Sequence, residues 1–493
     1  MTGPGLPPGF GLRLDPATRR LDDGRVLLGG RPRRLVRLTS TGARLVDRLE
    51  AGEAVPAAPP AQRLARRLLD GGLAHPRPDA STRPYGPLDV SVVIPVHVDD
   101  VAGLGRTLRS LGPCGEVVVV DDGSVARLDV ARCAEAQGAR LLRHDRPHGP
   151  AAARETGWRA ARRPVVAFVD AGVEVRAGWL DALLDHLADP AVGAVAPRVV
   201  AAGGATRRWI AAYEAVRSPL DLGTAEAAVG SGTTVSYVPT ATLVVRREAL
   251  EDVGGFDEEL RFGEDVDLVW RLGRRWTVRY DPRVAVVHAP RPTAARWLRQ
   301  RVDYGSSAGP LARRHGAAVA PWRASAWSTA VCALVAARRP GAALAVGTAG
   351  AAVLARRLHP VPGRTADRTR AVARTAALAS GLAATAHLSA GRQLVEALRR
   401  PWFPLTVALA APRRTRPVAL AVLALPPLVE WARDRPGLDP LRWEVLRLAD
   451  DVAYGAGVWW GALRHGAPGA LLPRPGGTGV ARPLTGPCAA PSA

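Results

Sequence analysis

Carboxylates follow apolar runs at several points of the sequence, as they do in a nucleotide-binding crevice. Residues 116–120 lead into Asp121-Asp122-Gly123-Ser124, and residues 90–94 lead into Pro95 and Val96. A carboxylate at the carboxyl end of a strand can accept hydrogen bonds from a uracil N–H or from ribose hydroxyls. The alternative is a turn that caps a helix, because Asp and Ser are common N-cap residues.

A glycine-containing helix start and a further strand end are candidates for binding phosphate. His148-Gly149-Pro150 precedes a helical stretch that carries Arg154, and such a helix start could approach a diphosphate. The same pattern also fits an ordinary surface helix in an arginine-rich protein. Residues 165–169 end at Asp170, which in a nucleotide-sugar enzyme would help to hold a divalent cation against the phosphates.

Residues 254–271 form a strongly acidic segment that includes Glu264 and Asp265. Apolar side chains such as Phe256 and Leu268 are interleaved with the acids, which favours a packed element over a solvated loop. A final apolar run, residues 284–287, ends at His288. A lone histidine is usually structural, but a ligand could reach this one at the end of its strand.

The composition weakens any inference from charge to nucleic acid. The chain has 493 residues and a formal net charge of +22, and all 67 of its basic residues are arginine. The 51 Gly and 43 Pro indicate a coding bias behind this charge. A predicted helix at residues 61–69 carries Arg63, Arg66 and Arg67, but arginines are spread along the whole chain, so we expect no nucleic-acid partner. The four cysteines form no CxxC pair, so neither a disulfide framework nor a zinc site is expected.

Residues 1–84 are predicted to form a small winged-helix-like domain with a linker. Residues 25–28 and 34–38 are typical of short strands, and residues 43–49 and 61–69 of helices. Several prolines between residues 76 and 87 predict the linker. No apolar run of the signal-peptide kind lies in the first 20 residues, so we expect a cytosolic start.

Residues 85–315 alternate between apolar runs and helical patterns, which predicts an α/β domain. A mostly parallel sheet with helices on both faces is expected, because uniformly apolar strands are typical of that class. The expected strands are residues 90–94, 117–120, 165–169, 192–195, 241–245 and 284–287, and the expected helices are residues 104–111, 131–136 and 151–161.

Residues 316–493 are rich in Ala and Arg and are predicted to be helical. The uncharged stretches are residues 324–337, 340–355, 375–391 and 417–429. Each is shorter than the roughly 20 apolar residues of a standard membrane-spanning helix. Two interpretations remain open: a soluble or interfacial helical bundle, and short helices in contact with the membrane surface.

Taken in order, these segments resemble family-two glycosyltransferases of the GT-A fold. The matching elements are Val92-Val93-Ile94-Pro95-Val96, Val120-Asp121-Asp122-Gly123-Ser124, Ala153-Arg154, Phe168-Val169-Asp170, Gly254-Gly255-Phe256-Asp257, Gly263-Glu264-Asp265-Val266-Asp267-Leu268 and Val287-His288. The resemblance covers about residues 88–305 and implies an inverting hexosyltransferase that uses a nucleotide sugar.

The resemblance also implies roles for individual residues. Asp265 would be the general base, with Glu264 beside it. The nucleotide sugar would be bound by Pro95, Val96, Asp121, Asp122 and Arg154. Asp170 and His288 would coordinate Mg²⁺ or Mn²⁺ on the diphosphate.

One position departs from the family pattern. The metal motif usually reads Asp, any residue, Asp, whereas this chain reads Asp170-Ala171-Gly172. Glu174 is the candidate to replace the missing carboxylate, although the sequence does not give its strand register. The metal site is therefore in doubt, and a catalytically impaired peptide-binding homologue is an alternative.

The whole chain resembles, more narrowly, the glycosyltransferases of the mycofactocin system. The opening Pro8-Gly9-Phe10-Gly11-Leu12-Arg13-Leu14-Asp15 and the order of the three regions carry this resemblance. It implies transfer of glucose from UDP-glucose to the peptide-derived redox cofactor mycofactocin or its precursor. The expected cytosolic start and the arginine-flanked C-terminal stretches predict a cytoplasmic protein at the inner face of the cell membrane. The N-terminal domain is similar to small winged-helix domains that recognise peptides. A cell-envelope glycan or a lipid-linked sugar is the alternative acceptor.

Overall fold

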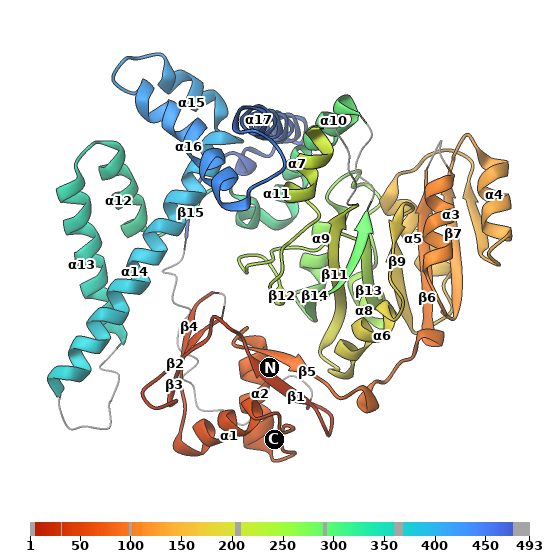
Figure 1. Cartoon of the computed structure of the whole chain (residues 1–493), viewed down its shortest axis with the longest axis horizontal. Coiled ribbons are helices and arrows are strands. Elements are labelled where there is room, and N and C mark those ends of the chain that lie inside the picture. Colours follow the sequence, from red (N-terminus) through yellow and green to blue (C-terminus); the bar gives the residue numbers. More distant parts are fainter. Residues whose placement is uncertain are drawn as a thin grey trace.

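The structure is a computed structural model that describes residues 5–30, 32–97, 101–202, 209–288, 293–358 and 368–476. Three bodies can be followed in Figure 1: a small N-terminal unit, a large twisted sheet with helices, and a set of C-terminal helices. Cys488 and the end of the predicted C-terminal region lie outside the described residues.

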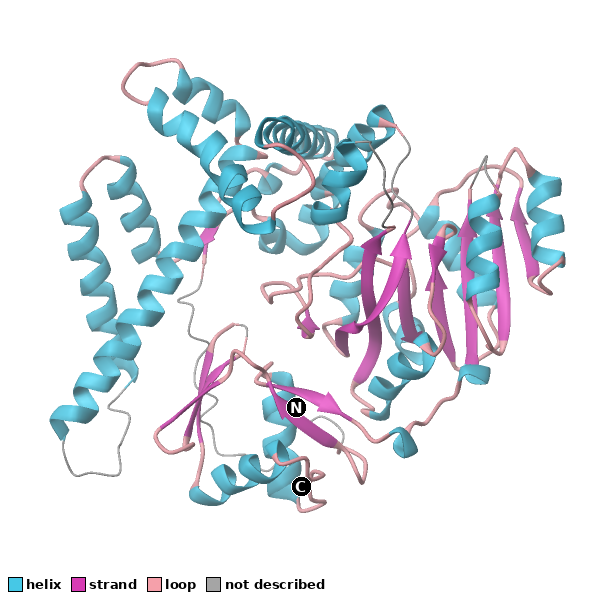
Figure 2. Cartoon of the chain, viewed as in Figure 1, coloured by secondary structure: helices cyan, strands magenta, loops and turns pink. Residues whose placement is uncertain are grey.

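The large sheet has nine strands in the order β10-β14-β11-β13-β9-β6-β7-β8, with β12 paired to β14 (Figure 2). The strands are β6 (Val90–Val96), β7 (Glu116–Asp122), β8 (Arg140–His144), β9 (Val165–Val169), β10 (Val173–Glu174), β11 (Val192–Ala201), β12 (Ala227–Val229), β13 (Thr242–Arg246) and β14 (Thr277–His288). β6 to β9 are parallel, and so are β11 and β14. The sheet is mixed, because β10, β12 and β13 run antiparallel to their neighbours.

Two apolar cores lie on the two faces of this sheet, as the uniformly apolar strands predict. One face packs against α3 (Ala102–Ser110), α4 (Arg127–Glu135) and α6 (Trp179–Leu184). The other packs against α5 (Pro150–Ala160), α8 (Arg247–Val253) and α9 (Glu264–Leu272). The central strand β9 is fully buried, because Val and Phe side chains point into both cores.

The N-terminal unit has its own core around Phe10, Leu27 and Leu68. It contains a pair of strands, β1 (Gly11–Leu14) and β5 (Ala74–Arg77), and three strands, β2 (Arg19–Leu21), β3 (Val26–Gly29) and β4 (Arg34–Arg37). Its helices are α1 (Ser40–Glu50) and α2 (Pro59–Asp70). The Thr39 hydroxyl accepts a hydrogen bond from the Gly42 N–H and so caps α1.

One expectation for this unit is wrong. Pro76 belongs to β5 and not to a linker, since proline is tolerated in an edge strand, here opposite Leu12. Arg66 on α2 is buried, and its guanidinium forms two 2.8 Å hydrogen bonds with the Asp189 carboxylate in the sheet domain. This buried ion pair fastens the unit to the sheet domain.

The remaining helices are α7 (Trp209–Arg217), α10 (Ala294–Ser306), α11 (Ala308–His315), α12 (Ala326–Ala336), α13 (Pro340–Leu358), α14 (Arg368–Arg399), α15 (Phe403–Ala410), α16 (Arg416–Asp434) and α17 (Pro440–Arg464). Helices α12, α13 and α14 form an arm that projects away from the sheet (Figure 1). Helices α15 and α16 form a hairpin that packs beside the C-terminal end of α14. Among the described residues, no helix is both long and apolar enough to cross a membrane.

Glycines allow α17 to contact α10 and α11 backbone to backbone. A Cβ atom at Gly457 would overlap the Val302 carbonyl oxygen, and one at Gly461 would overlap that of Ser306. The same holds for Gly305 against Tyr454 and for Gly309 against Gly461. We call these four glycines the glycine seam. The seam brings the C-terminal helices against the edge of the sheet where the site lies.

Candidate active site

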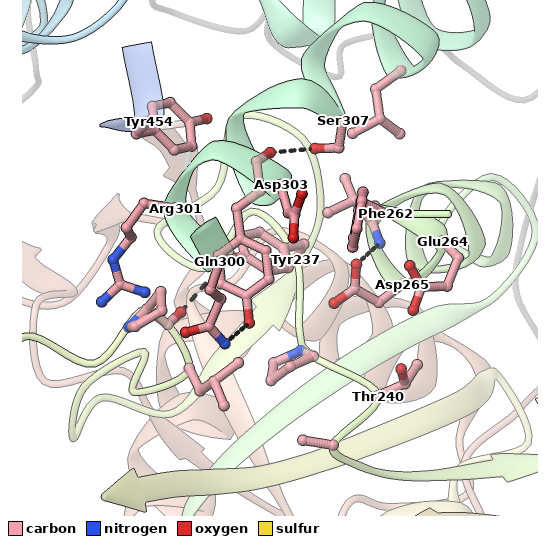
Figure 3. Close-up of a pocket in the computed structure, with 18 of the residues that line it drawn as sticks. Tyr237, Thr240, Phe262, Glu264, Asp265, Gln300, Arg301, Asp303, Ser307 and Tyr454 are labelled. Atoms are coloured by element: carbon pink, nitrogen blue, oxygen red, sulfur yellow. Dashed lines mark hydrogen bonds between the residues drawn. The ribbon is translucent and has the colours of Figure 1, made fainter. Parts of the chain in front are cut away.

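A cavity of about 1100 Å³ opens at the carboxyl ends of β9 and β14. Its walls come from α5, from the start of α9, from α10 and from α17 (Figure 3). Single ligand sites usually measure about 300–1000 Å³, so this volume is enough for a donor together with part of an acceptor. The cavity contains Arg154, Asp170, Glu264, Asp265 and His288, which are five of the residues predicted from the sequence.

Asp265 lies in the first turn of α9 with its carboxylate in the cavity (Figure 3). Its Oδ1 accepts a 2.8 Å hydrogen bond from the Val266 N–H. Burial, together with the neighbouring Glu264 carboxylate, raises the pKa of Asp265 to about 7. A carboxylate with this pKa exchanges protons near neutral pH, which is what a general base requires.

Gly263 determines how α9 begins. Its φ of +80° is left-handed, and a Cβ atom there would crowd the side chain of Ser307, the residue between α10 and α11. Glycine meets both requirements, because it adopts positive φ without strain. The glycine therefore allows α9 to start next to α10, which places Glu264 and Asp265 at the cavity wall.

Arg154 bridges two of the carboxylates predicted for the site, Asp170 and Glu264. Its guanidinium donates to Asp170 at 2.7 Å and to Glu264 at 2.8 Å, and its side chain is only 6% exposed. Burial raises the pKa of Glu264, and the positive charge of Arg154 opposes that shift. Because Arg154 is held between strand β9 and helix α9, it fixes the distance between them.

The structure does not bring Asp121 and Asp122 to the cavity wall. Asp122 accepts hydrogen bonds from the His148 and Gly149 N–H groups, at 2.8 and 2.7 Å, and these bonds together with His144 lower its pKa. Asp121 is buried against Arg143 and accepts a bond from the Ser124 N–H. Asp122 therefore orders the loop that leads into α5, and Asp121 orders the turn that follows β7. Pro95 and Val96 lie in β6, also away from the cavity wall, whereas His97 lines the cavity.

The metal ligands implied by the sequence are only partly brought together. Asp170 and His288 both line the cavity, but Glu174 does not. Its carboxylate binds Arg106 on α3 at 3.0 Å. Gly172 has a φ of +95° and open space around the position of a Cβ atom. Among the described residues, no group of three His, Cys, Asp or Glu side chains could hold a metal ion. One carboxylate and one imidazole fit a cation whose other ligands are phosphate oxygens and water.

The sequence did not reveal the arginines that gather around the cavity. Eight arginines line the cavity, of which Arg154, Arg217, Arg301 and Arg400 form ion pairs with carboxylates. Within the described part of the chain, the other four form no such pair: Arg261, Arg296, Arg299 and Arg323. Their charge suits an anionic ligand. A coding bias toward arginine conceals such a cluster in the sequence.

The sequence also did not reveal that the C-terminal helices contribute residues to the cavity. Tyr454 and Asp450 of α17 line the cavity beside Tyr304 of α10. The Asp450 carboxylate accepts a 2.7 Å hydrogen bond from the Tyr213 hydroxyl and pairs with Arg301 at 2.9 Å. Arg301 also pairs with Glu214 on α7. This buried network fixes α17 to α10 and α7. No local pattern indicates contacts between residues so far apart.

Comparison with known proteins identifies the family. Residues 91–254 match the family described as Glycosyl transferase family 2. The chain is 40% identical over 495 residues to the pre-mycofactocin glycosyltransferase of Mycobacterium tuberculosis, covering 96% of this chain and 99% of that protein. It is 25% identical over 187 residues to human polypeptide N-acetylgalactosaminyltransferase 18, covering 32% and 30% of the two chains.

Among solved structures, one similar chain is a mannosyltransferase from Pyrobaculum calidifontis in complex with GDP-mannose and Mn²⁺. It has 21% sequence identity and a TM-score of 0.37, over 70% of this chain and 86% of that one. The match along almost the full length of the mycobacterial relative settles the assignment. The chain belongs to the pre-mycofactocin glycosyltransferases, which are family-two glycosyltransferases of the GT-A fold.

Proposed function

We propose that the protein transfers a hexose, glucose from UDP-glucose, to mycofactocin or its precursor with inversion at the anomeric carbon. The observation that carries this proposal is the position of Asp265, a half-buried carboxylate with a raised pKa that faces the cavity. Asp265 takes the proton of the acceptor hydroxyl as its oxygen attacks the anomeric carbon. The bond between that carbon and the diphosphate oxygen breaks, and UDP leaves.

The donor diphosphate belongs, in this proposal, on the wall that carries Arg154, Asp170 and His288. A Mg²⁺ or Mn²⁺ ion held by Asp170 and His288 would supply positive charge to the leaving group. Arg154 keeps Asp170 oriented. Among the described residues, Arg261, Arg296, Arg299 and Arg323 form no ion pair, and their positive charge in the same cavity favours an anionic donor. Asp122 acts through the loop before α5, Asp121 acts through the turn after β7, and His97 is the nearby side chain that reaches the cavity.

Transfer to the mycofactocin precursor tests the proposed function directly. The purified protein is incubated with UDP-glucose and pre-mycofactocin, and products are separated by mass spectrometry. We expect a product heavier by one or more hexose residues. The support for a peptide-derived acceptor is the N-terminal unit and the relative's name. Hydrolysis of UDP-glucose without any transfer would indicate another acceptor, such as a cell-envelope glycan. Failure to bind UDP at all would favour a catalytically impaired peptide-binding homologue.

Introducing the missing carboxylate is expected to increase metal dependence. UDP binding is measured by calorimetry with Mn²⁺ and with EDTA, for the wild type and for Gly172→Asp. We expect Mn²⁺ to tighten UDP binding about tenfold more in the variant, because its new carboxylate faces open space beside Asp170. Gly172→Asn is the matched control, since it has the same backbone cost without the charge. An equal response to Mn²⁺ in all three proteins would place the cation elsewhere.

We also propose that the protein acts at the inner face of the cell membrane, through the hairpin of α15 and α16. The apolar side chains it exposes include Leu405, Val407, Leu420, Leu425 and Val429. Arg413, Arg414 and Arg416 are exposed at its turn. Apolar side chains beside cations are typical of helices that lie in an anionic membrane surface.

Vesicle sedimentation tests this membrane contact. We expect the protein to sediment with vesicles that contain phosphatidylglycerol and to remain in solution with purely zwitterionic ones. Replacing Leu405, Leu420 and Leu425 with Ser should lower the bound fraction at least fivefold, whereas replacing the equally exposed Leu88 on the sheet domain should not. Equal binding by both variants would exclude the hairpin as the contact.

A further inference from the structure

We propose that helix α17 completes the acceptor site, with Tyr454, Tyr237 and Tyr304 forming a subsite for a ring of the acceptor, either a sugar or an aromatic ring. The inference deepens the proposed function and rests on it. It assigns a binding role to the C-terminal helices, which lie outside the part of the chain that matches the family.

The three tyrosines gather at one cavity from three separate segments. Tyr237 follows β12, Tyr304 belongs to α10, and Tyr454 belongs to α17. The whole chain has only 6 tyrosines, so half of them line this cavity. All three are half-buried, as expected for residues of a wall and not of the core. Such a concentration in a chain with 5% aromatic residues indicates a ligand that presents a flat face.

Asp265 lines the same cavity as the tyrosines and as Arg154 and Asp170, and Figure 3 shows it near Tyr237. Burial raises the pKa of Tyr237, and Asp265, Tyr304 and Tyr454 raise it further, so each of these three groups lies within electrostatic reach of Tyr237. Asp265 is also within electrostatic reach of Arg154 and Asp170. With the donor on the side of Arg154, the acceptor hydroxyl must approach Asp265 from the side of the tyrosines.

The tyrosine side chains are held in place. The Tyr304 hydroxyl accepts a 2.8 Å hydrogen bond from Gln300 (Figure 3). The Arg400 guanidinium lies 4.9 Å from the Tyr454 ring centre, a cation–π contact. The glycine seam and the Asp450–Arg301 pair fix the backbone on either side of Tyr454. A preorganised aromatic wall loses little conformational entropy when a ring stacks on it.

Measurements on Tyr454→Ala and Tyr454→Phe test the subsite. We expect Tyr454→Ala to raise the KM for pre-mycofactocin about tenfold, the size of effect that a lost aromatic contact produces. UDP binding by calorimetry and the slow hydrolysis of UDP-glucose without acceptor should stay at the wild-type level. Tyr454→Phe should stay within threefold of wild type, because it keeps the ring. The control is Trp460→Ala, which removes an exposed aromatic side chain from the same helix.

A second experiment measures binding of a simple ring-bearing ligand, so it does not require that the natural acceptor be known. Saturation-transfer NMR is recorded with p-nitrophenyl β-glucoside and UDP, and we expect a signal that Tyr454→Ala abolishes and Trp460→Ala leaves intact. An unchanged signal or KM in Tyr454→Ala, or no signal with the wild type, overturns the subsite. Loss of UDP binding in Tyr454→Ala also overturns it, by making Tyr454 a structural or donor-side residue. Absence of UDP binding by the wild type would instead overturn the proposed function.

Discussion

Replacing Asp265 with asparagine is expected to slow sugar transfer about 10²–10⁴-fold, which is the usual contribution of a general base. Asparagine has nearly the same shape but cannot take the proton of the acceptor hydroxyl. UDP affinity should change little, because the donor wall around Arg154 and Asp170 remains. Initial rates with UDP-glucose and pre-mycofactocin give the transfer rate, and calorimetry gives the UDP affinity.

Glu259→Gln provides the matched control for Asp265→Asn. Glu259 belongs to the same acidic segment, but its side chain is 90% exposed and its nearest cation is Arg314, at 3.6 Å. This variant should transfer sugar at the wild-type rate. If Asp265→Asn kept more than a tenth of the wild-type rate, another group would have to be the base.

The pH dependence of the rate follows from the same carboxylate. Burial and Glu264 raise the pKa of Asp265 to about 7, so the base is protonated below that pH and available above it. The rate at saturating substrate should therefore increase as the pH rises through 7, and below pH 7 it should fall about tenfold per unit. A rate that stays constant between pH 5.5 and 8 would exclude Asp265 as the titrating base.

Replacing Gly457 with alanine is expected to destabilise the fold, although alanine normally stabilises a helix. A Cβ atom at this position would overlap the Val302 carbonyl oxygen across the glycine seam. Overpacking of this kind costs about 1–3 kcal/mol, whereas the intrinsic helix preference of alanine is worth at most about 1 kcal/mol. The variant should unfold at a lower temperature and should also lose transfer activity, because α17 carries Tyr454.

Gly391→Ala is the control for the seam. Gly391 lies within α14, and no atom lies within 4 Å of the position of its Cβ atom. The same substitution there should raise the midpoint of thermal unfolding slightly or leave it unchanged. A Gly457→Ala protein as stable as Gly391→Ala would mean that α17 is not packed against α10 as described.

The strands and helices of the sheet domain were predictable because their signals are local. Runs of Val gave the strands, and burial of β9 on both faces explains why its run is uniformly apolar. Strand direction is not local: β13 is as buried as β9 yet runs antiparallel to it. Apolar periodicity reports burial and contains no information about direction.

The sequence allowed prediction of only one side of the candidate site, the side that carries Asp170, Asp265 and His288. Asp170, Asp265 and His288 each lie at the end of an element, where sequence position and chemistry agree. Glu174 lies away from the cavity for a reason of register: Val173 pairs with His288, so the next residue points to the opposite face of the sheet. The opposite wall depends on contacts such as that between Tyr213 and Asp450, 237 residues apart, which no spacing rule encodes.

Ion pairs join the N-terminal unit to the sheet domain, so the unit cannot simply be removed or exchanged on its own. Arg66 binds Asp189, Arg77 binds Glu226 at 2.9 Å, and Arg83 binds Asp185 at 2.8 Å. Removing one partner of a buried pair costs about 3–5 kcal/mol, so a truncated or transplanted sheet domain would inherit acids without their counter-charges. Exchange of this unit between related enzymes, in the laboratory or in evolution, therefore requires Asp189 and Glu226 to change with it.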